Sequence, residues 1–176
     1  MTRKEFLNRI SKSRKDVLGE FFDRVNSRGI PVCVIGGLAV NAYAEPVVSL
    51  DLDIVVAADR VPELLRTLPP SFKVKKYPNS LNLTSPDSDL RIQLQTDPRY
   101  QEFIIRARKR DVLGYRLPVA RIQDVLQGKI WAAEDETRRP SKRQKDLSDI
   151  LRLLEVRKSL LSMLPSSLRK KLDYRA

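Results

Sequence analysis

The stretch VIGGLAVNAYAEPVVSLDLDIVV, residues 34–56, constrains this chain more than any other. It holds two apolar runs; the first ends at Gly36 and Gly37, and the second is interrupted by Asp51 and Asp53. Short apolar runs rich in β-branched residues and bounded by turn residues are typical of buried strands. Side chains at i and i+2 of a strand project from one face. The stretch therefore predicts two neighbouring carboxylates on a strand that follows a glycine turn.

The carboxylate pair predicts a metal site. Two unpaired aspartates repel each other, and a divalent cation is their natural partner because it neutralises both and prefers oxygen ligands. The alternative is a pair of surface aspartates on a half-exposed strand. The glycine pair favours the metal, because it stands between a strand and a short helix, where bare backbone N–H groups can approach a phosphate. Strand, Gly-Gly, helix and Ser49-x-Asp51-x-Asp53 together predict a phosphate cradle beside a metal ion.

Composition narrows the chemistry that such a site can perform. The chain of 176 residues has no histidine and a single cysteine, Cys33, which excludes a Cys/His zinc site and a Ser-His-Asp triad. Any metal is therefore Mg²⁺ or Mn²⁺ held by carboxylates. The formal net charge of +12 favours polyanionic partners such as nucleotides and nucleic acid, although a charged surface that serves solubility explains it equally well.

The sequence offers no membrane segment. No apolar run approaches the roughly 20 residues that span a bilayer. The N-terminal MTRKEFLNRISKSRKD carries charges throughout, whereas a signal peptide has an apolar centre. We expect a cytoplasmic protein with no membrane partner.

Hydrophobic periodicity predicts an α+β (mixed αβ) fold in which a sheet gives way to helices near Pro118. We expect a core at 1–118 and a C-terminal helical region at 119–176 packed on it. The expected strands are 30–35, 49–56, 72–78, 80–86, 89–96 and 115–120. The expected helices are 4–29, 37–45, 61–68, 100–110, 121–136, 141–164 and 166–173.

The first motif resembles that of the nucleotidyltransferase superfamily related to DNA polymerase β, in which a Gly-Gly or Gly-Ser pair is followed by Asp-x-Asp. Gly36, Gly37, Ser49, Asp51 and Asp53 match this pattern. The chain is most similar to the minimal bacterial nucleotidyltransferases that include the toxin subunits of abortive-infection toxin–antitoxin systems. Those proteins carry a later motif, a lysine followed after a spacer by Arg-x-x-Asp-x-x-Asp, which matches Lys129, Arg143, Asp146 and Asp149.

This resemblance implies a central mixed sheet flanked by helices and two-metal transfer of a nucleotide. Asp51 and Asp53 would hold Mg²⁺ or Mn²⁺ against an NTP triphosphate, while Gly36, Gly37 and Ser49 would contact phosphates. Residues of the later motif would line the rim of the site: Lys129 and Arg143 toward the phosphates, and Asp146 beside them. Without the resemblance, the spacing of Asp146 and Asp149 favours ordinary ion pairs on a helix surface. A cognate antitoxin is an implied partner.

The third carboxylate of the resembling family has no obvious counterpart. Relatives often carry an aspartate within the strand that corresponds to DLRIQLQT, where this chain has Gln93, which cannot act as a base. Asp89 lies on the same strand face, but four residues or roughly 13 Å earlier along an extended chain. Asp89 is either the third catalytic carboxylate or the first residue of a strand after a turn.

Two basic segments, 106–110 and 138–145, can contact an RNA backbone, although charge runs are often simply solvated faces. The leading hypothesis is an enzyme that moves a nucleoside monophosphate from an NTP to a hydroxyl of RNA such as tRNA, of protein or of a small molecule. The alternative is a catalytically impaired protein of the same fold that binds nucleotide or nucleic acid.

Overall fold

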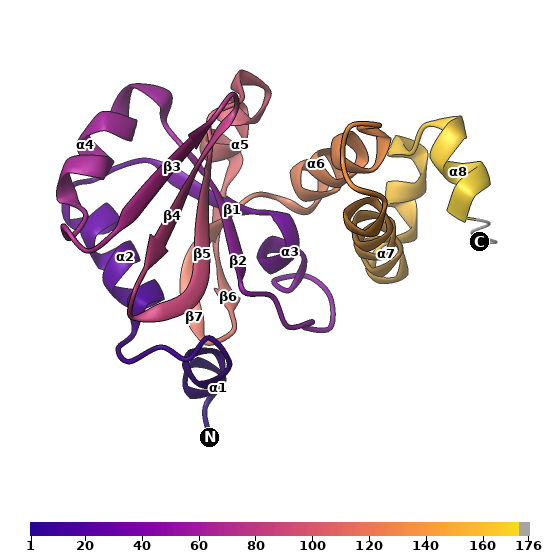
Figure 1. Ribbon diagram of the computed structural model, residues 1–176. Helices are drawn as coiled ribbons and strands as arrows, with labels where there is room; N and C mark the ends of the chain where they lie inside the picture. The colour runs from indigo at the N-terminus through magenta and orange to yellow at the C-terminus, as the bar shows by residue number, and fades with distance from the viewer. Residues whose placement is uncertain (173–176) are drawn as a thin grey trace.

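The computed structural model describes residues 1–172, and its centre is a seven-stranded mixed sheet with the order β3-β4-β5-β2-β1-β7-β6 (Figure 1). This confirms the expected α+β class. The strands are β1 (Val32–Ile35), β2 (Asp51–Val56), β3 (Lys73–Tyr77), β4 (Ser80–Ser85), β5 (Ser88–Gln95), β6 (Arg108–Val112) and β7 (Tyr115–Val119).

Strand directions in the sheet follow from the connections. Strands β3, β4 and β5 form an antiparallel meander joined by short turns, as the alternating pattern predicts. Strand β2 then pairs parallel with β5 and antiparallel with β1, and β1 pairs parallel with β7. The carboxylate strand β2 therefore lies near the middle of the sheet, with β5 on one side and β1 on the other.

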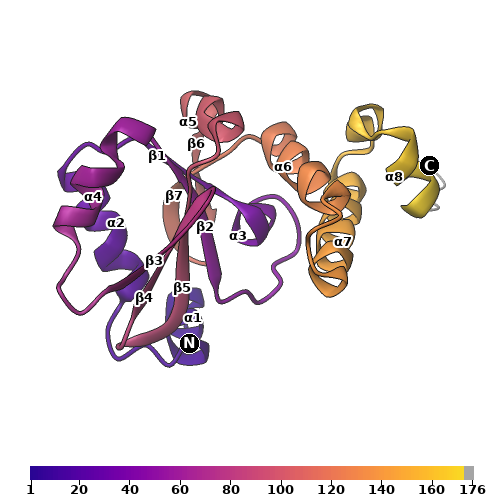
Figure 2. The ribbon, with the colours of Figure 1, turned by 45° about the horizontal axis from the view of Figure 1, so that its top comes forward.

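Helices lie on both sides of the sheet (Figures 1 and 2). Helices α2 and α4 cover one face, whereas α3, α6, α7 and α8 lie on the opposite side. Apart from three 3₁₀ segments in residues 1–172, the helices are α1 (Arg3–Ile10), α2 (Val17–Ser27), α3 (Gly36–Val40), α4 (Val61–Thr67), α5 (Gln101–Arg106), α6 (Ile122–Glu134), α7 (Pro140–Val156) and α8 (Ser166–Leu172).

The core sits between the apolar face of the sheet and helices α2 and α4. Alternate residues of the central strands are fully buried, among them Leu52 and Ile54 of β2 and Ile92 of β5. The residues between them face the other way and are polar, because strand side chains alternate. This alternation directs Asp51 and Asp53 toward the side where α6 and α7 lie.

The expected long helix at 4–29 is two helices. Helix α1 ends at Ile10, and α2 begins at Val17 with Asp16 as its N-cap, whose carboxylate accepts a hydrogen bond from Gly19 N at 2.9 Å. Between them Lys12 has a positive φ of 48°. The polar SKSRKD segment explains the break, since Ser and Asp favour caps and turns over helix interiors.

The expected helix at 100–110 is also wrong in its second half. Helix α5 ends at Arg106, and residues 108–112 form strand β6, which pairs with β7. The turn between them contains Leu113 and Gly114, both with positive φ, the conformation of a tight two-residue hairpin. A charged, exposed edge strand resembles a surface helix in composition, which is why the sequence misled.

The C-terminal helices match the prediction in part. Helix α7 ends at Val156, and a 3₁₀ segment at Lys158–Met163 replaces the expected continuation to 164. The last expected helix, 166–173, is α8, and Asp173 lies outside the described residues. The division at 118/119 stays a prediction. None of the helices within residues 1–172 is long and apolar enough to cross a membrane.

Candidate functional site

The predicted carboxylates meet at a cavity of about 260 Å³ between the sheet and helices α6 and α7. Parallel pairing places Asp51 opposite Arg91 of β5, and Asp53 opposite Gln93. All four side chains line the cavity, together with residues of α6 and α7 that include Lys129 and Lys142. The long-range pairing of β2 with β5 thus builds a polar floor from two short pieces of sequence.

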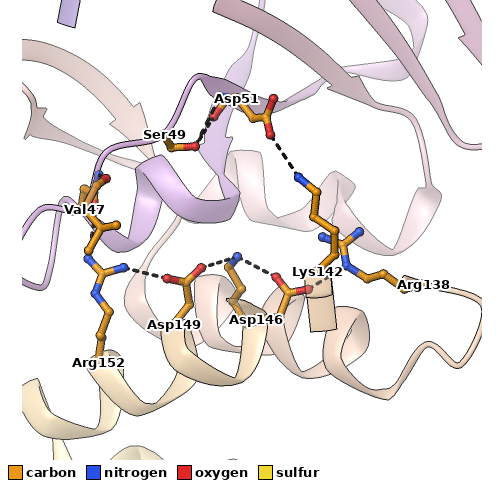
Figure 3. A network of polar contacts seen from close by, with 10 residues as sticks. Val47, Ser49, Asp51, Arg138, Lys142, Asp146, Asp149 and Arg152 are labelled. Carbon is orange, nitrogen blue, oxygen red and sulfur yellow. Dashed lines mark hydrogen bonds and ion pairs between the residues drawn. The ribbon is translucent and has the colours of Figure 1, made fainter. Parts of the chain in front are cut away.

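Asp51 is held by two cations, Arg91 and Lys142, of which Figure 3 shows Lys142. Arg91 donates to its Oδ1 from Nε at 2.9 Å and from Nη2 at 2.6 Å, and Lys142 Nζ lies 3.4 Å from Oδ2. Ser49 Oγ accepts a hydrogen bond from the Asp51 backbone N–H at 3.3 Å. Partial burial raises the pKa of Asp51, but the hydrogen bonds and charge of Arg91, together with Lys142, outweigh it and lower the pKa overall. Asp51 is therefore a carboxylate at neutral pH.

Asp53 differs from its neighbour because, within residues 1–172, its carboxylate accepts no hydrogen bond and forms no ion pair at salt-bridge distance. Burial raises its pKa above the ordinary value, with the Lys129 charge opposing and the Asp51 charge adding to the effect. A carboxylate in this state gains most from an added cation, because both its desolvation and its repulsion by Asp51 are then compensated.

Gly36 is required for Asp53 to occupy its place. Its φ of +67° is a conformation that glycine adopts freely, and a Cβ built at Gly36 would lie only 2.1 Å from Asp53 Oδ2. A Cβ built at Gly37 would instead meet Lys145 Nζ and Ser49 Oγ at 3.9 Å, which is ordinary contact. The first glycine thus admits the carboxylate, and the second leaves the backbone open toward a lysine and a hydroxyl.

Lys129 joins helices α6 and α7 in a buried ion network (Figure 3). Its Nζ lies 2.9 Å from Asp146 Oδ1 and 2.6 Å from Asp149 Oδ2, and the lysine is only 7% exposed. Arg138 pairs with the second oxygen of Asp146 at 2.7 Å, and Arg152 pairs with Asp149 at 2.7 Å. Burial lowers the pKa of Lys129, but the charges of Asp149 and Asp146 outweigh it and raise the pKa overall.

This ion network joins Lys129, at the start of the later motif, to Asp146 and Asp149 at its end. The network is buried, whereas an ion pair on a helix surface would be exposed. It holds α7 against α6, and α7 carries Lys142 to the cavity. Lys129, Asp146 and Arg138 all line the cavity wall. Lys129 is engaged with two carboxylates, whereas Lys142 has a single contact with Asp51 at 3.4 Å and is the more weakly held cation of the cavity.

Four predicted site residues do not line the cavity: Gly37 and Ser49, which lie beside it, and Asp89 and Arg143. Asp89 pairs with Lys12 at 3.1 Å, its backbone N–H donates to Ser11 O, and it does not line the cavity. Asp89 is the second residue of β5, and the pairing of β5 with β2 starts two residues later, at Arg91 opposite Asp51. Asp89 is therefore not placed beside Asp51 and Asp53 as a third carboxylate. Arg143 does not line the cavity either; its Nε is buried without a hydrogen-bond partner in the described part of the chain.

Sequence reasoning missed the cationic and amide side of the cavity. Arg91 and Asn82 line it, and Asn82 lies opposite Gln93 on β4. Strand alternation alone assigns Arg91 and Gln93 to one polar face, but nothing in the sequence gives the register that brings Arg91 to Asp51. Tyr100 also lines the cavity, and its ring packs edge-on against Trp131, so Trp131 is part of an aromatic cluster.

The residues present suit one divalent cation. Asp53 has a free carboxylate, and Asp51 has one oxygen, Oδ2, whose partner Lys142 lies at the long distance of 3.4 Å. Carboxylate oxygens are the ligands that Mg²⁺ and Mn²⁺ prefer. Within residues 1–172 no cluster of three or more acidic, histidine or cysteine side chains is placed to hold a metal ion. The donor set is therefore smaller than the two-metal expectation requires.

The basic segments lie in different places. Residues 108–110 belong to the edge strand β6, which β7 and β1 separate from β2. Arg106 pairs with Asp124 at 3.0 Å. The segment 138–145, in contrast, covers the loop and first turns of α7, from which Arg138 and Lys142 reach the cavity. Only this second segment adds positive charge at the cavity itself.

Neither a protein-family model nor a curated protein sequence matches this chain, but solved structures do. The antibiotic-resistance factor ANT(2'')-Ia, solved in complex with adenylyl-2''-tobramycin, superposes with a TM-score of 0.63 at 14% identity, covering 88% of this chain and 96% of that one. The lincosamide antibiotic adenylyltransferase LnuA, solved with lincomycin bound, gives 0.57 at 10% identity over 81% and 99%.

An antigenic nucleotidyltransferase-like protein from Paracoccidioides brasiliensis gives a TM-score of 0.57 at 16% identity, over 94% of this chain and 88% of that one. At these identities the likeness is one of fold. The chain has the nucleotidyltransferase fold, as its first motif predicts.

Proposed function

We propose that this protein is a metal-dependent nucleotidyltransferase that moves a nucleoside monophosphate from an NTP to an acceptor hydroxyl. The observation that carries the proposal is the pair Asp51 and Asp53 on the floor of a cationic cavity, beside a glycine whose Cβ would displace Asp53. The nucleotidyltransferase fold supports it, because the same fold in other proteins performs this reaction on antibiotics.

In the proposed reaction the acceptor oxygen bonds to the α-phosphorus, the bond from that phosphorus to the bridging oxygen breaks, and pyrophosphate leaves. Asp51 and Asp53 would hold Mg²⁺ or Mn²⁺, which supplies charge neutralisation to the phosphates. Lys142 and Lys145 would bind the triphosphate as point charges. The hydroxyl proton passes to water in the open cavity, since Gln93 cannot accept it.

The acceptor has room beside the first cavity. A second cavity of about 490 Å³ shares Gln95, Tyr100 and Arg138 with the first and extends to Trp131 and Arg99. Its mixed lining of aromatic, acidic and basic groups suits a hydroxylated small molecule. The basic segment 138–145 at the same edge suits an RNA end such as that of tRNA. Both acceptor classes, and a protein hydroxyl, belong in the first assay.

The test is to incubate the protein with each α-labelled NTP, Mg²⁺ or Mn²⁺, and in separate reactions bulk tRNA, total protein and hydroxylated antibiotics. The matched control is the Asp51→Asn, Asp53→Asn double variant, which keeps the shape of both side chains. Transfer by the wild type that is lost in the folded double variant supports the proposal and identifies the acceptor. Equal labelling by both proteins contradicts it.

The alternative is an impaired protein of this fold that binds nucleotide or nucleic acid without transfer. Gln93 at the position opposite Asp53 is the observation that favours it. Metal-dependent NTP binding with no transfer to any acceptor class is the result that selects this alternative.

A toxin role with a cognate antitoxin is part of the proposal and rests on the resemblance of the two motifs alone. Induced expression in a bacterial host tests it. Growth arrest by the wild type, absent with the Asp51→Asn, Asp53→Asn variant at equal protein level, supports the role. Normal growth with active enzyme in the cell contradicts it.

A further inference from the structure

The strand that faces the carboxylates offers no third acid. On the cavity face of β5 stand Arg91, Gln93 and Gln95, and Gln93 lies opposite Asp53. Asp89, the one acid on that face of β5, is paired with Lys12 outside the cavity. The strand thus presents one cation and two neutral amides where two-metal transfer needs another carboxylate.

The other acids that line the cavity are already neutralised. Asp124 pairs with Arg106 at 3.0 Å and with Arg121 at 3.1 Å. Asp146 pairs with Lys129 and Arg138 through its two oxygens. Within residues 1–172 only Asp51 and Asp53 remain as anionic ligands of the cavity.

One oxygen of Asp51 is occupied as well. Arg91 directs two donors to Oδ1 at 2.6 and 2.9 Å, whereas Oδ2 has only the 3.4 Å contact with Lys142. A guanidinium keeps its charge at every working pH. Asp51 therefore has a fixed cation on Oδ1 and one oxygen available to a metal ion, so it is poorly suited to bridge two.

From these contacts we propose that the site takes a single divalent cation together with its NTP, and that Arg91 contributes the positive charge of a second one. This rests on the proposed function and specifies how its site is charged. Asp51 Oδ2 and Asp53 would hold the ion. Gln93 excludes a second ion because an amide oxygen carries no charge to offset the repulsion between two divalent cations.

The test counts bound ions directly. The protein is saturated with an NTP analogue whose α,β-bridge is a methylene group, so that no transfer occurs, and titrated with Mn²⁺ while electron paramagnetic resonance measures free and bound ions. One Mn²⁺ per chain with an uncoupled spectrum is expected. Two ions with a spin-coupled spectrum overturn the inference alone. No Mn²⁺ bound in the presence of the analogue overturns the proposed function as well.

Two variants of β5 test whether Gln93 limits the number of bound Mn²⁺ ions. Gln93→Asp restores a carboxylate opposite Asp53 and is expected to bind two coupled Mn²⁺ ions. Gln95→Asp is the matched control, because it adds the same charge on the same face but opposite Val55, and one ion is expected. A folded Gln93→Asp protein that still binds one ion, or a Gln95→Asp protein that binds two, contradicts the role assigned to Gln93.

A separate measurement tests whether Arg91 supplies the positive charge of a second metal ion. Arg91→Gln removes the fixed cation without adding a charged ligand, so the count stays at one while affinity for the NTP analogue falls about tenfold, the size of one charge-assisted contact. Arg9→Gln, on an exposed face of α1, is the control for lost net charge. Equal affinity in both variants contradicts the contribution of Arg91.

Discussion

Replacing Lys129 with methionine tests whether the buried ion network holds helices α6 and α7 together. The change removes the ammonium that lies 2.9 and 2.6 Å from two carboxylates, Asp146 and Asp149, which are 2% and 3% exposed. Arg138 and Arg152 still pair with one acid each, but the charge between the two acids is lost. Breaking a buried ion pair from one side costs about 3–5 kcal/mol of unfolding free energy.

For a chain of this size that loss corresponds to a fall in melting temperature of about 6–20 °C. Urea denaturation at pH 7 measures the unfolding free energy, and calorimetry measures the melting temperature. Lys145→Met, an exposed lysine on the same helix, is the matched control, with an expected change within about 0.5 kcal/mol. The triple variant Lys129→Met, Asp146→Asn, Asp149→Asn should recover part of the loss, because neither acid is then a buried charge without its lysine, while Arg138 and Arg152 lose their ion pairs.

The pH dependence gives a second check on the same network. The pKa of Lys129 is raised above its ordinary 10.5 in the folded protein, so its contribution is complete below the unfolded pKa and disappears as pH rises through the folded pKa. The stability difference between wild type and Lys129→Met should therefore stay constant from pH 7 to 9 and shrink above 10.5. A difference under 1 kcal/mol at pH 7 would refute the reasoning.

Three further outcomes concern Gly36, the buried Cys33 and removal of the metal ion. Gly36→Ala should destabilise the fold by about 1–3 kcal/mol and weaken Mn²⁺ binding in a titration, because its Cβ collides with Asp53; Gly29→Ala, with φ +57° but open space around it, should cost about 1 kcal/mol and leave Mn²⁺ affinity unchanged. Equal Mn²⁺ affinity in the two variants would contradict the steric argument. Burial raises the pKa of Cys33 to about 12, so a thiol reagent should modify it only in urea, and rapid labelling of the native protein at pH 8 would be inconsistent with its place in β1. Addition of EDTA should abolish transfer and Mn²⁺ should restore it, and transfer that survives chelation would contradict the assigned role of Asp51 and Asp53.

The sequence predicts local features of this fold well. The meander of β3, β4 and β5 and the burial of Leu90, Ile92 and Leu94 follow from strict alternation. The break in the helix at 4–29 and the strand at 108–112 were missed. Charged residues are compatible with a helix as well as with a turn or an edge strand, so their pattern does not distinguish these structures. Capping in the first segment and strand pairing in the second determine which one forms.

The candidate site was predictable in its acids and not in its cations. Asp51 and Asp53 share a short motif, whereas the contact of Arg91 with Asp51 depends on a strand register set by residues 40 positions apart. The two ends of the Lys129 network are likewise separated by a loop, so its burial appears only in three dimensions. The exclusion of Asp89 has the same cause, since its distance from Asp51 is fixed by where β2 begins relative to β5.

The central claim is that Asp51 and Asp53 serve transfer of the α-phosphoryl group of an NTP, and comparison of two labels tests it most directly. Parallel reactions contain the same NTP labelled at the α- or the γ-phosphate, with Mg²⁺ and the acceptor fraction that accepts label. We expect the α-label on the acceptor and the γ-label in released pyrophosphate, with both signals lost in Asp51→Asn, Asp53→Asn. Label transferred from the γ-position, or an undiminished α-signal in the double variant, would contradict the account.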